Sequence, residues 1–168
     1  RDRSTSPSLD LDVTASSCIA VLPRTADELP VFWWAAGVPS SGCFVPAFVH
    51  GSKLPTIVSA AGTFGKKVTP PDRVVSDRFS EDSYWWLFRD LADKVNLDWK
   101  ARNVVVRAEF NALEKEFAAG LPDIMRQAVS LRKAGKIEDA VATLDAFTAG
   151  CVEKEVQTAN GLRKKFAP

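Results

Sequence analysis

The stretch VFWWAA, residues 31–36, decides the fold of this chain, because six consecutive apolar residues are too few for a helix of ordinary length. Its bulky aromatic rings predict a strand that is covered on both faces. Neighbouring side chains of a strand point to opposite faces. At most one of Trp33 and Trp34 can therefore line a pocket, and we expect the other to pack under a helix.

Two further strands are predicted on either side of this run. Residues 17–22 are rich in Ile and Val and end at Pro23, as strands often do. Residues 43–49 form the third, and Pro46 within it cannot donate a ladder hydrogen bond, which indicates an edge position or a bulge. Short turns connect the three runs, so the sequence predicts an antiparallel sheet.

The C-terminal half follows helical spacing instead. The chain therefore divides into a strand-rich segment, residues 1–52, a long loop, residues 53–76, and a helical segment, residues 77–168. Together they form a single α+β piece. The expected helices run from a cap at Ser80 or Asp82 to Val95, over 104–119 up to a break at Gly120 and Pro122, over 123–134, and over 137–162 with interruptions at Gly135 and Gly150.

Composition excludes several classes of function. The chain has 168 residues, enough for one domain, and 22 basic against 21 acidic residues give a net charge of +1. This balance gives no electrostatic case for binding nucleic acid or an anionic membrane. No apolar run approaches the roughly 20 residues of a membrane-spanning helix. Arg1–Ser6 contains no apolar signal core, so nothing calls for export and the cytoplasm is the simpler expectation.

The three cysteines have no metal-like spacing, so we expect neither a metal site nor a cofactor. Because their number is odd, at least one is unpaired, and a protein without disulfides is the simpler interpretation. A bond between Cys18 and Cys43 stays open, since neighbouring strands could bring the two together.

Several motifs occur together in a recognisable order. The chain reads TASS at residues 14–17, an apolar run ending GVP at 37–39, SSGCFVP at 40–46, SYWWLF at 83–88 and AEFNALEKE at 108–116. In order and spacing they resemble the secernin and dipeptidase family of N-terminal-nucleophile amide hydrolases. The resemblance is best over residues 13–48 and looser towards the C-terminus.

The resemblance implies a four-layer αββα sandwich and cleavage of amide bonds by an N-terminal Cys whose own α-amine is the base. This chain starts with Arg1, so it would be the C-terminal part of such a hydrolase, supplying scaffold and pocket. The nucleophile would lie on an upstream chain of the same precursor, separated by autoprocessing or nicking. The implied partners are that chain, a small amide or peptide substrate, and a second copy of the heterodimer.

Four serines are the candidate substrate-binding residues. Ser16 and Ser17 start a predicted strand, and Ser40 and Ser41 lie in a turn where Gly37 and Gly42 let backbone amides approach a ligand, as an oxyanion site requires. The alternative is that these hydroxyls only satisfy the backbone of the loops.

Other interpretations stay open. Cys18 is more simply a buried small hydrophobe, and Cys43 and Cys151 are more simply packing residues. A Cys18–His50 dyad, or hydrolysis by Cys18 or Cys43 alone, would make the chain a self-contained enzyme. Arg3 could bind a substrate carboxylate. A second class of function is a non-catalytic interaction module with no active site.

Overall fold

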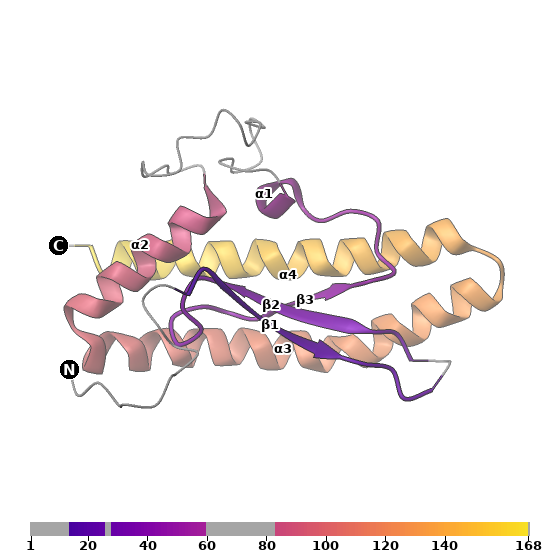
Figure 1. Cartoon of the computed structure of the whole chain (residues 1–168), viewed down its shortest axis with the longest axis horizontal. Helices are drawn as coiled ribbons and strands as arrows, with labels where there is room; N and C mark the ends of the chain where they lie inside the picture. Colours follow the sequence, from indigo (N-terminus) through magenta and orange to yellow (C-terminus); the bar gives the residue numbers. More distant parts are fainter. Residues whose placement is uncertain (1–13, 26–27, 60–82, 168) are drawn as a thin grey trace.

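The computed structural model describes residues 14–25, 28–59 and 83–167. There the chain is α+β, with a three-stranded antiparallel sheet on the N-terminal side and long helices following it (Figure 1). Arg3, Ser80 and Asp82 lie outside the described residues. The elements are β1 (Ser16–Val21), β2 (Val31–Ala36), β3 (Val45–Phe48), α1 (Thr56–Ser59), α2 (Tyr84–Leu97), α3 (Trp99–Lys133) and α4 (Ile137–Lys165).

The sheet has the strand order β1-β2-β3, and both pairs are antiparallel, as the sequence predicts. β2 has the predicted bounds because Pro30 precedes it and Gly37, with a φ of 69°, turns the chain after it. Pro46 lies in the edge strand β3, which confirms the edge prediction. β3 packs against α4, whereas β1 is the outermost strand (Figure 1).

The covering of the sheet differs from the expectation. Phe32 of β2 is 39% exposed and Trp33 and Trp34 are half-buried, so the strand is not covered on both faces. As predicted, only one of the two Trp rings lines a pocket. Trp34 stacks on Tyr84 of α2, with 5.4 Å between ring centroids, whereas Trp33 lines a surface groove. The predicted loop 53–76 contains the short helix α1.

α2 begins one residue after Ser83, whose hydroxyl caps the helix by accepting the N–H of Trp86 at 3.4 Å. α3 and α4 are each longer than the sequence predicts. α3 continues through Gly120 and Pro122, and α4 continues through Gly150, so these three expected breaks are wrong. The expected interruption at Gly135 is confirmed.

Packing between the two long helices explains their continuity. Leu121 and Ala128 of α3 lie on either side of Pro122 in sequence, and both are buried against Ala140 and Leu144 of α4. Most helical stability in proteins comes from such contacts rather than from propensity. Pro122 is exposed, so its missing N–H removes one hydrogen bond at the solvent side of the helix.

The turn between α3 and α4 is a Schellman motif. The N–H of Lys136 donates to the carbonyl of Leu131 at 2.9 Å, and the N–H of Gly135 donates to that of Arg132 at 3.0 Å. Gly135 has a φ of 76°, the left-handed conformation that this motif requires. The two helices therefore return antiparallel, side by side along the molecule (Figure 1).

Two apolar clusters form the core. The larger joins α2 and the adjoining parts of α3 and α4 with one end of the sheet, around Phe88, Leu91, Phe110 and Val152. The smaller lies at the other end of the sheet, where Leu29, Val31 and Phe48 meet α3 and α4. Across the described residues, no helix has the length and apolar character to cross a membrane.

Candidate functional site

The predicted substrate-binding serines lie at the same end of the sheet. The register pairs Ser16 with Ala36 and Ser17 with Ala35, next to the β2–β3 connection that holds Ser40 and Ser41. Ser16 is exposed and Ser17 is half-buried, so both are accessible from solvent. Ser41 is 2% exposed, and its hydroxyl donates to the carbonyl of Val38 at 3.4 Å. Ser41 therefore holds its own turn rather than facing solvent.

The β2–β3 connection is fastened to α3 by polar side chains. Arg107 Nη1 donates to the carbonyl of Gly42 at 2.7 Å, and Asn103 Nδ2 donates to that of Ser40 at 2.9 Å. Glu114 accepts the N–H of Phe44 at 3.0 Å and pairs with Arg107 at 3.2 Å. None of these three residues was predicted as functional from the sequence: Arg107 and Glu114 lie within the expected helix 104–119, and Asn103 lies just before it.

Backbone amides of this connection are already engaged. The Gly37 N–H donates to the carbonyl of Ala15 at 2.9 Å, and the Ser41 N–H donates to that of Val38 at 3.0 Å. Gly42 is needed for close packing, because a Cβ there would lie 3.0 Å from the carbonyl oxygen of Ala36. The two glycines thus serve the turn, and the amides of Gly37 and Ser41 are not directed at an external oxyanion.

The three cysteines are all free thiols in different environments. Cys18 is exposed, contrary to the expectation that it is buried. Cys43 and Cys151 are buried, as expected. Burial raises the pKa of the Cys43 thiol far above its ordinary value, with the nearby carboxylates of Glu155 and Glu114 adding to it. Burial raises the pKa of Cys151 to about 12. Neither buried thiol is ionised near neutral pH, so neither is an activated nucleophile.

Cys18 and His50 are not brought together. Cys18 pairs with Trp34, which pairs with Val45, so β3 lies two strands away from Cys18, roughly 9–10 Å across the sheet. His50 follows β3 at the opposite end from the β2–β3 connection. Among the described residues, no hydrogen bond joins the two side chains, and they do not form a catalytic dyad in this conformation.

A buried polar pair lies inside the larger core cluster. The Tyr84 hydroxyl donates to Glu155 Oε2 at 2.5 Å, and neither residue is more than 5% exposed. Within the described part of the chain, Glu155 Oε1 has no hydrogen-bond partner. Burial raises the pKa of Glu155 and that of Tyr84 well above their ordinary values. The carboxyl is thereby held in its neutral form, which suits a structural hydrogen bond in an apolar core.

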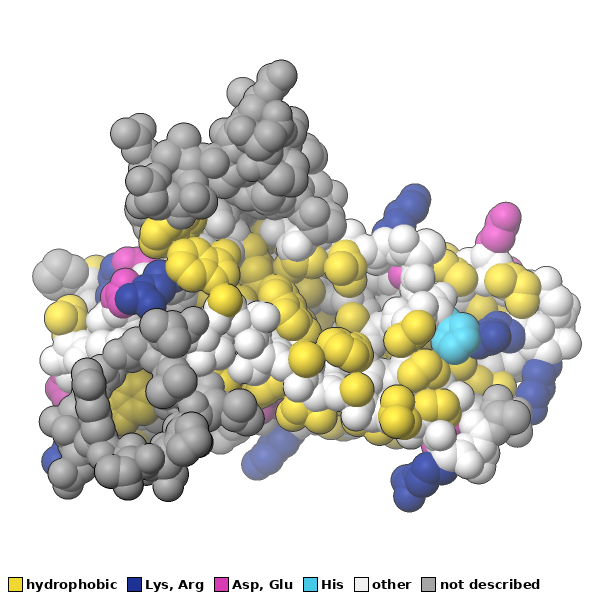
Figure 2. All heavy atoms as spheres, in the orientation of Figure 1, with side chains coloured by type: hydrophobic (Ala, Val, Ile, Leu, Met, Phe, Trp, Pro, Cys, Tyr) yellow, Lys and Arg dark blue, Asp and Glu magenta, His cyan; other side chains and the backbone are white. Residues whose placement is uncertain are grey.

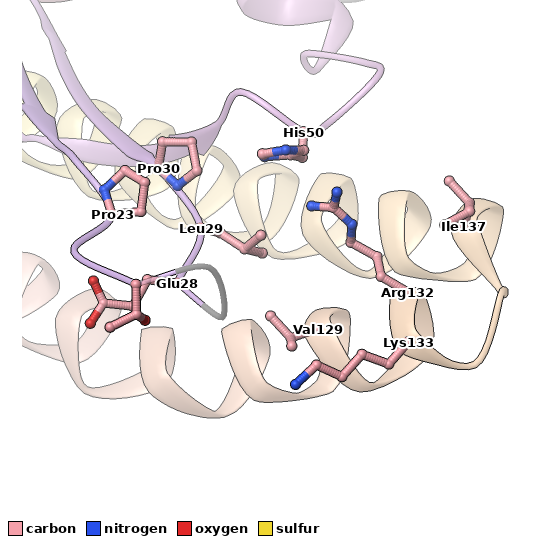
Figure 3. A pocket seen from close by; sticks show the side chains of 10 residues that line it. Pro23, Glu28, Leu29, Pro30, His50, Val129, Arg132, Lys133 and Ile137 are labelled. Carbon is pink, nitrogen blue, oxygen red and sulfur yellow. The ribbon is translucent and has the colours of Figure 1, made fainter.

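The accessible hollows lie at the other end of the sheet. One, of about 530 Å³, lies between the β1–β2 turn, His50 and the end of α3 (Figure 3). A second, of about 730 Å³, adjoins it and lies between β1, β2 and the middle of α3. Both are lined by Glu28, Leu29, Val129 and Lys133, so we treat them as one groove, the α3 groove.

The outer strand β1 is the other accessible feature. Ile19, Val21 and Leu22 are 54%, 49% and 74% exposed. Phe32, which pairs with Ala20, is 39% exposed on the opposite face of the sheet from Ile19 and Val21. Hydrophobic side chains gather across the middle of the face shown in Figure 2. β1 contains no charged residue and no proline, so nothing in its sequence protects its free edge from pairing with another strand.

In the described part of the chain, no group of three or more His, Cys, Asp or Glu side chains could hold a metal ion. Comparisons with protein-family models, with curated proteins and with solved structures gave no match for this chain.

Proposed function

We propose that this chain is the C-terminal part of an N-terminal-nucleophile amide hydrolase of the secernin and dipeptidase type. Its sheet would form one wall of the active site, and the nucleophilic Cys would lie on an upstream chain of the same precursor. The observation that carries the proposal is the open edge of the sheet, together with the motif order of the sequence.

The open edge favours continuation of the sheet into other polypeptide. An uncharged edge strand of six residues with Ile19 and Val21 exposed is a template for strand pairing. Native proteins usually protect or cover such an edge. Added strands on β1 would extend the sheet, and a second sheet against its exposed face would give the four-layer αββα sandwich. Three strands with helices supply only part of that arrangement.

The thiols of this chain support a nucleophile elsewhere. Cys43 and Cys151 are buried with raised pKa values, and Cys18 lacks a neighbouring base among the described residues. In the proposed mechanism, the terminal amine of the partner chain, with a pKa of about 8, takes the proton of the adjacent thiol. The thiolate attacks the amide carbon, the amine leaves with that proton, and water releases the acid from the thioester.

Within this mechanism we assign the contact with substrate to Ser16 and Ser17. Both are accessible, at the end of the sheet where the β2–β3 connection is fixed to α3. Ser40 and Ser41 would act through that connection, by keeping its backbone in place. Substrates would be small linear amides, such as dipeptides or acylated amino acids, and no cofactor takes part.

A second candidate, a non-catalytic interaction module, is favoured by the same exposed strand. Assembly through β1 requires no reactive thiol. The two functions differ in whether the assembled protein cleaves amides and in which chain carries the reactive sulfur.

The test starts from the complete gene product purified from its own cells. Native and denaturing mass measurements should find the 18.3 kDa chain bound to a second chain that begins with Cys. Alkylation with iodoacetamide should abolish hydrolysis of dipeptides in step with labelling of that Cys, whereas Cys18→Ala should retain full activity. A folded, stable 18.3 kDa monomer would overturn the hydrolase proposal. An assembly without amidase activity, or with activity that survives full alkylation, would favour the interaction module.

A further inference from the structure

The α3 groove combines an apolar floor with a basic end. Leu29 and Val129 lie at the junction of its two hollows, and Ile137 closes the end near His50. The hollow over the middle of α3 is lined mainly by apolar side chains, those of Val21, Leu22, Val31, Trp33, Leu121, Pro122 and Met125. A volume of about 730 Å³ with this lining is within the range of small-molecule sites, which are roughly 300–1,000 Å³ and mostly apolar.

Arg132 and His50 lie at the other end of the groove, which Lys133 also lines. Figure 3 shows the Arg132 side chain extending from α3 towards His50, which enters from the exit of β3. In the described ranges, neither the Arg132 guanidinium nor the His50 imidazole has a hydrogen-bond or ion-pair partner. A guanidinium presents a planar fork of donors that matches a carboxylate. This end of the groove therefore offers unused donors to an anion.

The single acidic group of the described lining does not neutralise this end. Glu28 lies on the β1–β2 turn, where its carboxylate accepts the backbone N–H of Arg24 at 2.7 Å. Arg126, on the rim of the apolar hollow, is paired with Asp123 on its own helix. The lining as a whole is therefore positive: Arg132 and His50 lie at one end, Lys133 lines both hollows, and Arg24 lines the apolar one.

From this arrangement we propose that the α3 groove binds a single-chain carboxylate, a molecule with one carboxylate on one aliphatic chain. The carboxylate lies between Arg132 and His50, and the chain lies along Leu29, Val129 and the apolar hollow over α3. The site is separate from the serine end of the sheet and does not rest on the hydrolase proposal, so binding is measured without any assay of amide cleavage.

An alternative role for Arg132 is to stabilise the last turn of α3, where a cation interacts favourably with the helix dipole. That role accounts for the charge but not for the adjoining apolar hollow. The two roles give different results in a binding experiment, because only a ligand site distinguishes the head group and the chain length of the molecule added.

The experiment titrates the full chain with dodecanoate below its micelle concentration and follows the heat of binding. Dodecanoate should bind once per chain. Dodecanol, which has the same chain without the charge, should bind about tenfold more weakly, since a charge-assisted pair is lost. Butanoate, which has the carboxylate without a long chain, should show no measurable binding because too little apolar area is buried.

Three variants localise the site. Arg132→Gln should weaken dodecanoate binding by about tenfold and leave dodecanol binding unchanged. Met125→Asp should abolish the binding of both. Lys115→Gln removes a positive charge from an exposed position of α3 outside the groove lining and should change neither. Equal binding of dodecanoate and dodecanol, or unchanged dodecanoate binding by a folded Arg132→Gln variant, would overturn the proposal, as would no binding at all.

Discussion

At the residue scale, Glu155 departs most from the pattern around it. It lies on the buried face of α4, in a row with Cys151, Val152 and Ala159, where helical spacing favours apolar side chains. The Tyr84 hydroxyl supplies one hydrogen bond, and burial raises the pKa of the carboxyl. A buried carboxyl that keeps its proton in the folded state makes the stability of the protein depend on pH.

Burial of the Glu155 carboxyl makes the protein less stable as the pH rises. Above about pH 4.5 the carboxyl of Glu155 ionises in the unfolded chain but keeps its proton in the folded one. The folded state then binds more protons, so stability falls as pH rises from 4.5 towards the raised pKa, by up to about 1.4 kcal/mol per pH unit. Glu155→Gln removes this slope. Urea unfolding between pH 5 and 8 should show a flatter pH dependence for this variant than for the parent.

The matched control for this prediction is Glu153→Gln, on the exposed side of α4. It should keep the parent's pH dependence. If the pH dependence of Glu155→Gln were also unchanged, the buried carboxyl would not be protonated in the folded state.

At the scale of elements, single polar contacts fix where segments meet. Asp145 of α4 accepts the backbone N–H of Ser52 at 3.0 Å and the Ser52 hydroxyl at 2.9 Å, which pins the chain after β3 onto the helix. Gly51 makes this approach possible, because a Cβ there would lie 2.6 Å from Asp145 Oδ1. This contact also sets the position of His50, two residues before Ser52, at the mouth of the α3 groove.

We therefore expect Gly51→Ala to destabilise the protein by about 1–2 kcal/mol through loss of these hydrogen bonds. Combining it with Asp145→Ala should add less than the sum of the two single changes, because both remove the same contact. Gly150→Ala is the control, since nothing lies within 4 Å of a Cβ at that helical position. It should stabilise by about 0.5–1 kcal/mol. Denaturant unfolding of Gly51→Ala, Asp145→Ala, their double variant and Gly150→Ala measures these changes in the free energy of unfolding. If the effects of Gly51→Ala and Asp145→Ala were fully additive, the two changes would not remove the same contact.

At the scale of the whole molecule, the sheet is closed on one side and open on the other. Neither β1 nor β3 has a further strand on its outer side in the described chain, but β3 packs against α4, whereas β1 packs chiefly against β2. The Gly37 N–H donates to the Ala15 carbonyl, so Ala15 and Gly37 form a hydrogen-bonded pair. Hydrogen-bonded and non-hydrogen-bonded pairs alternate along antiparallel strands, so the amides of Ser17, Ile19 and Val21 bond to β2. The amides of Ser16, Cys18 and Ala20 then point outward along the open edge.

This alternation gives a hydrogen-exchange test of the open edge. In the isolated chain, the amides of Ser16, Cys18 and Ala20 should exchange much faster than those of the alternate residues of β1. In the protein purified with its partners, all six should be protected, because an added strand bonds to the outward groups. Fast exchange of the outward amides in that assembly would show that no strand is added to β1.

Much of the sheet could be predicted from the sequence, because its signals are local. The apolar run of six residues between Pro30 and Gly37 coincides with β2, and Pro46 indicated that β3 is an edge strand. The helix breaks at Gly120, Pro122 and Gly150 were predicted wrongly, since propensity is a weak term beside packing between α3 and α4. The groove and the Tyr84–Glu155 pair were not predicted, because their members are far apart in the chain.

The sequence by itself determined the α+β class, the order of the strands and the turn at Gly135, since hydrophobic period, proline and glycine act within a few residues. Only the tertiary structure decided which strand is left exposed, which thiols are buried and which basic groups meet at the α3 groove. Burial and the lining of a groove depend on distant segments coming together, such as Glu155 with Tyr84 in the core and Arg132 with His50 in the α3 groove, and no local pattern contains them.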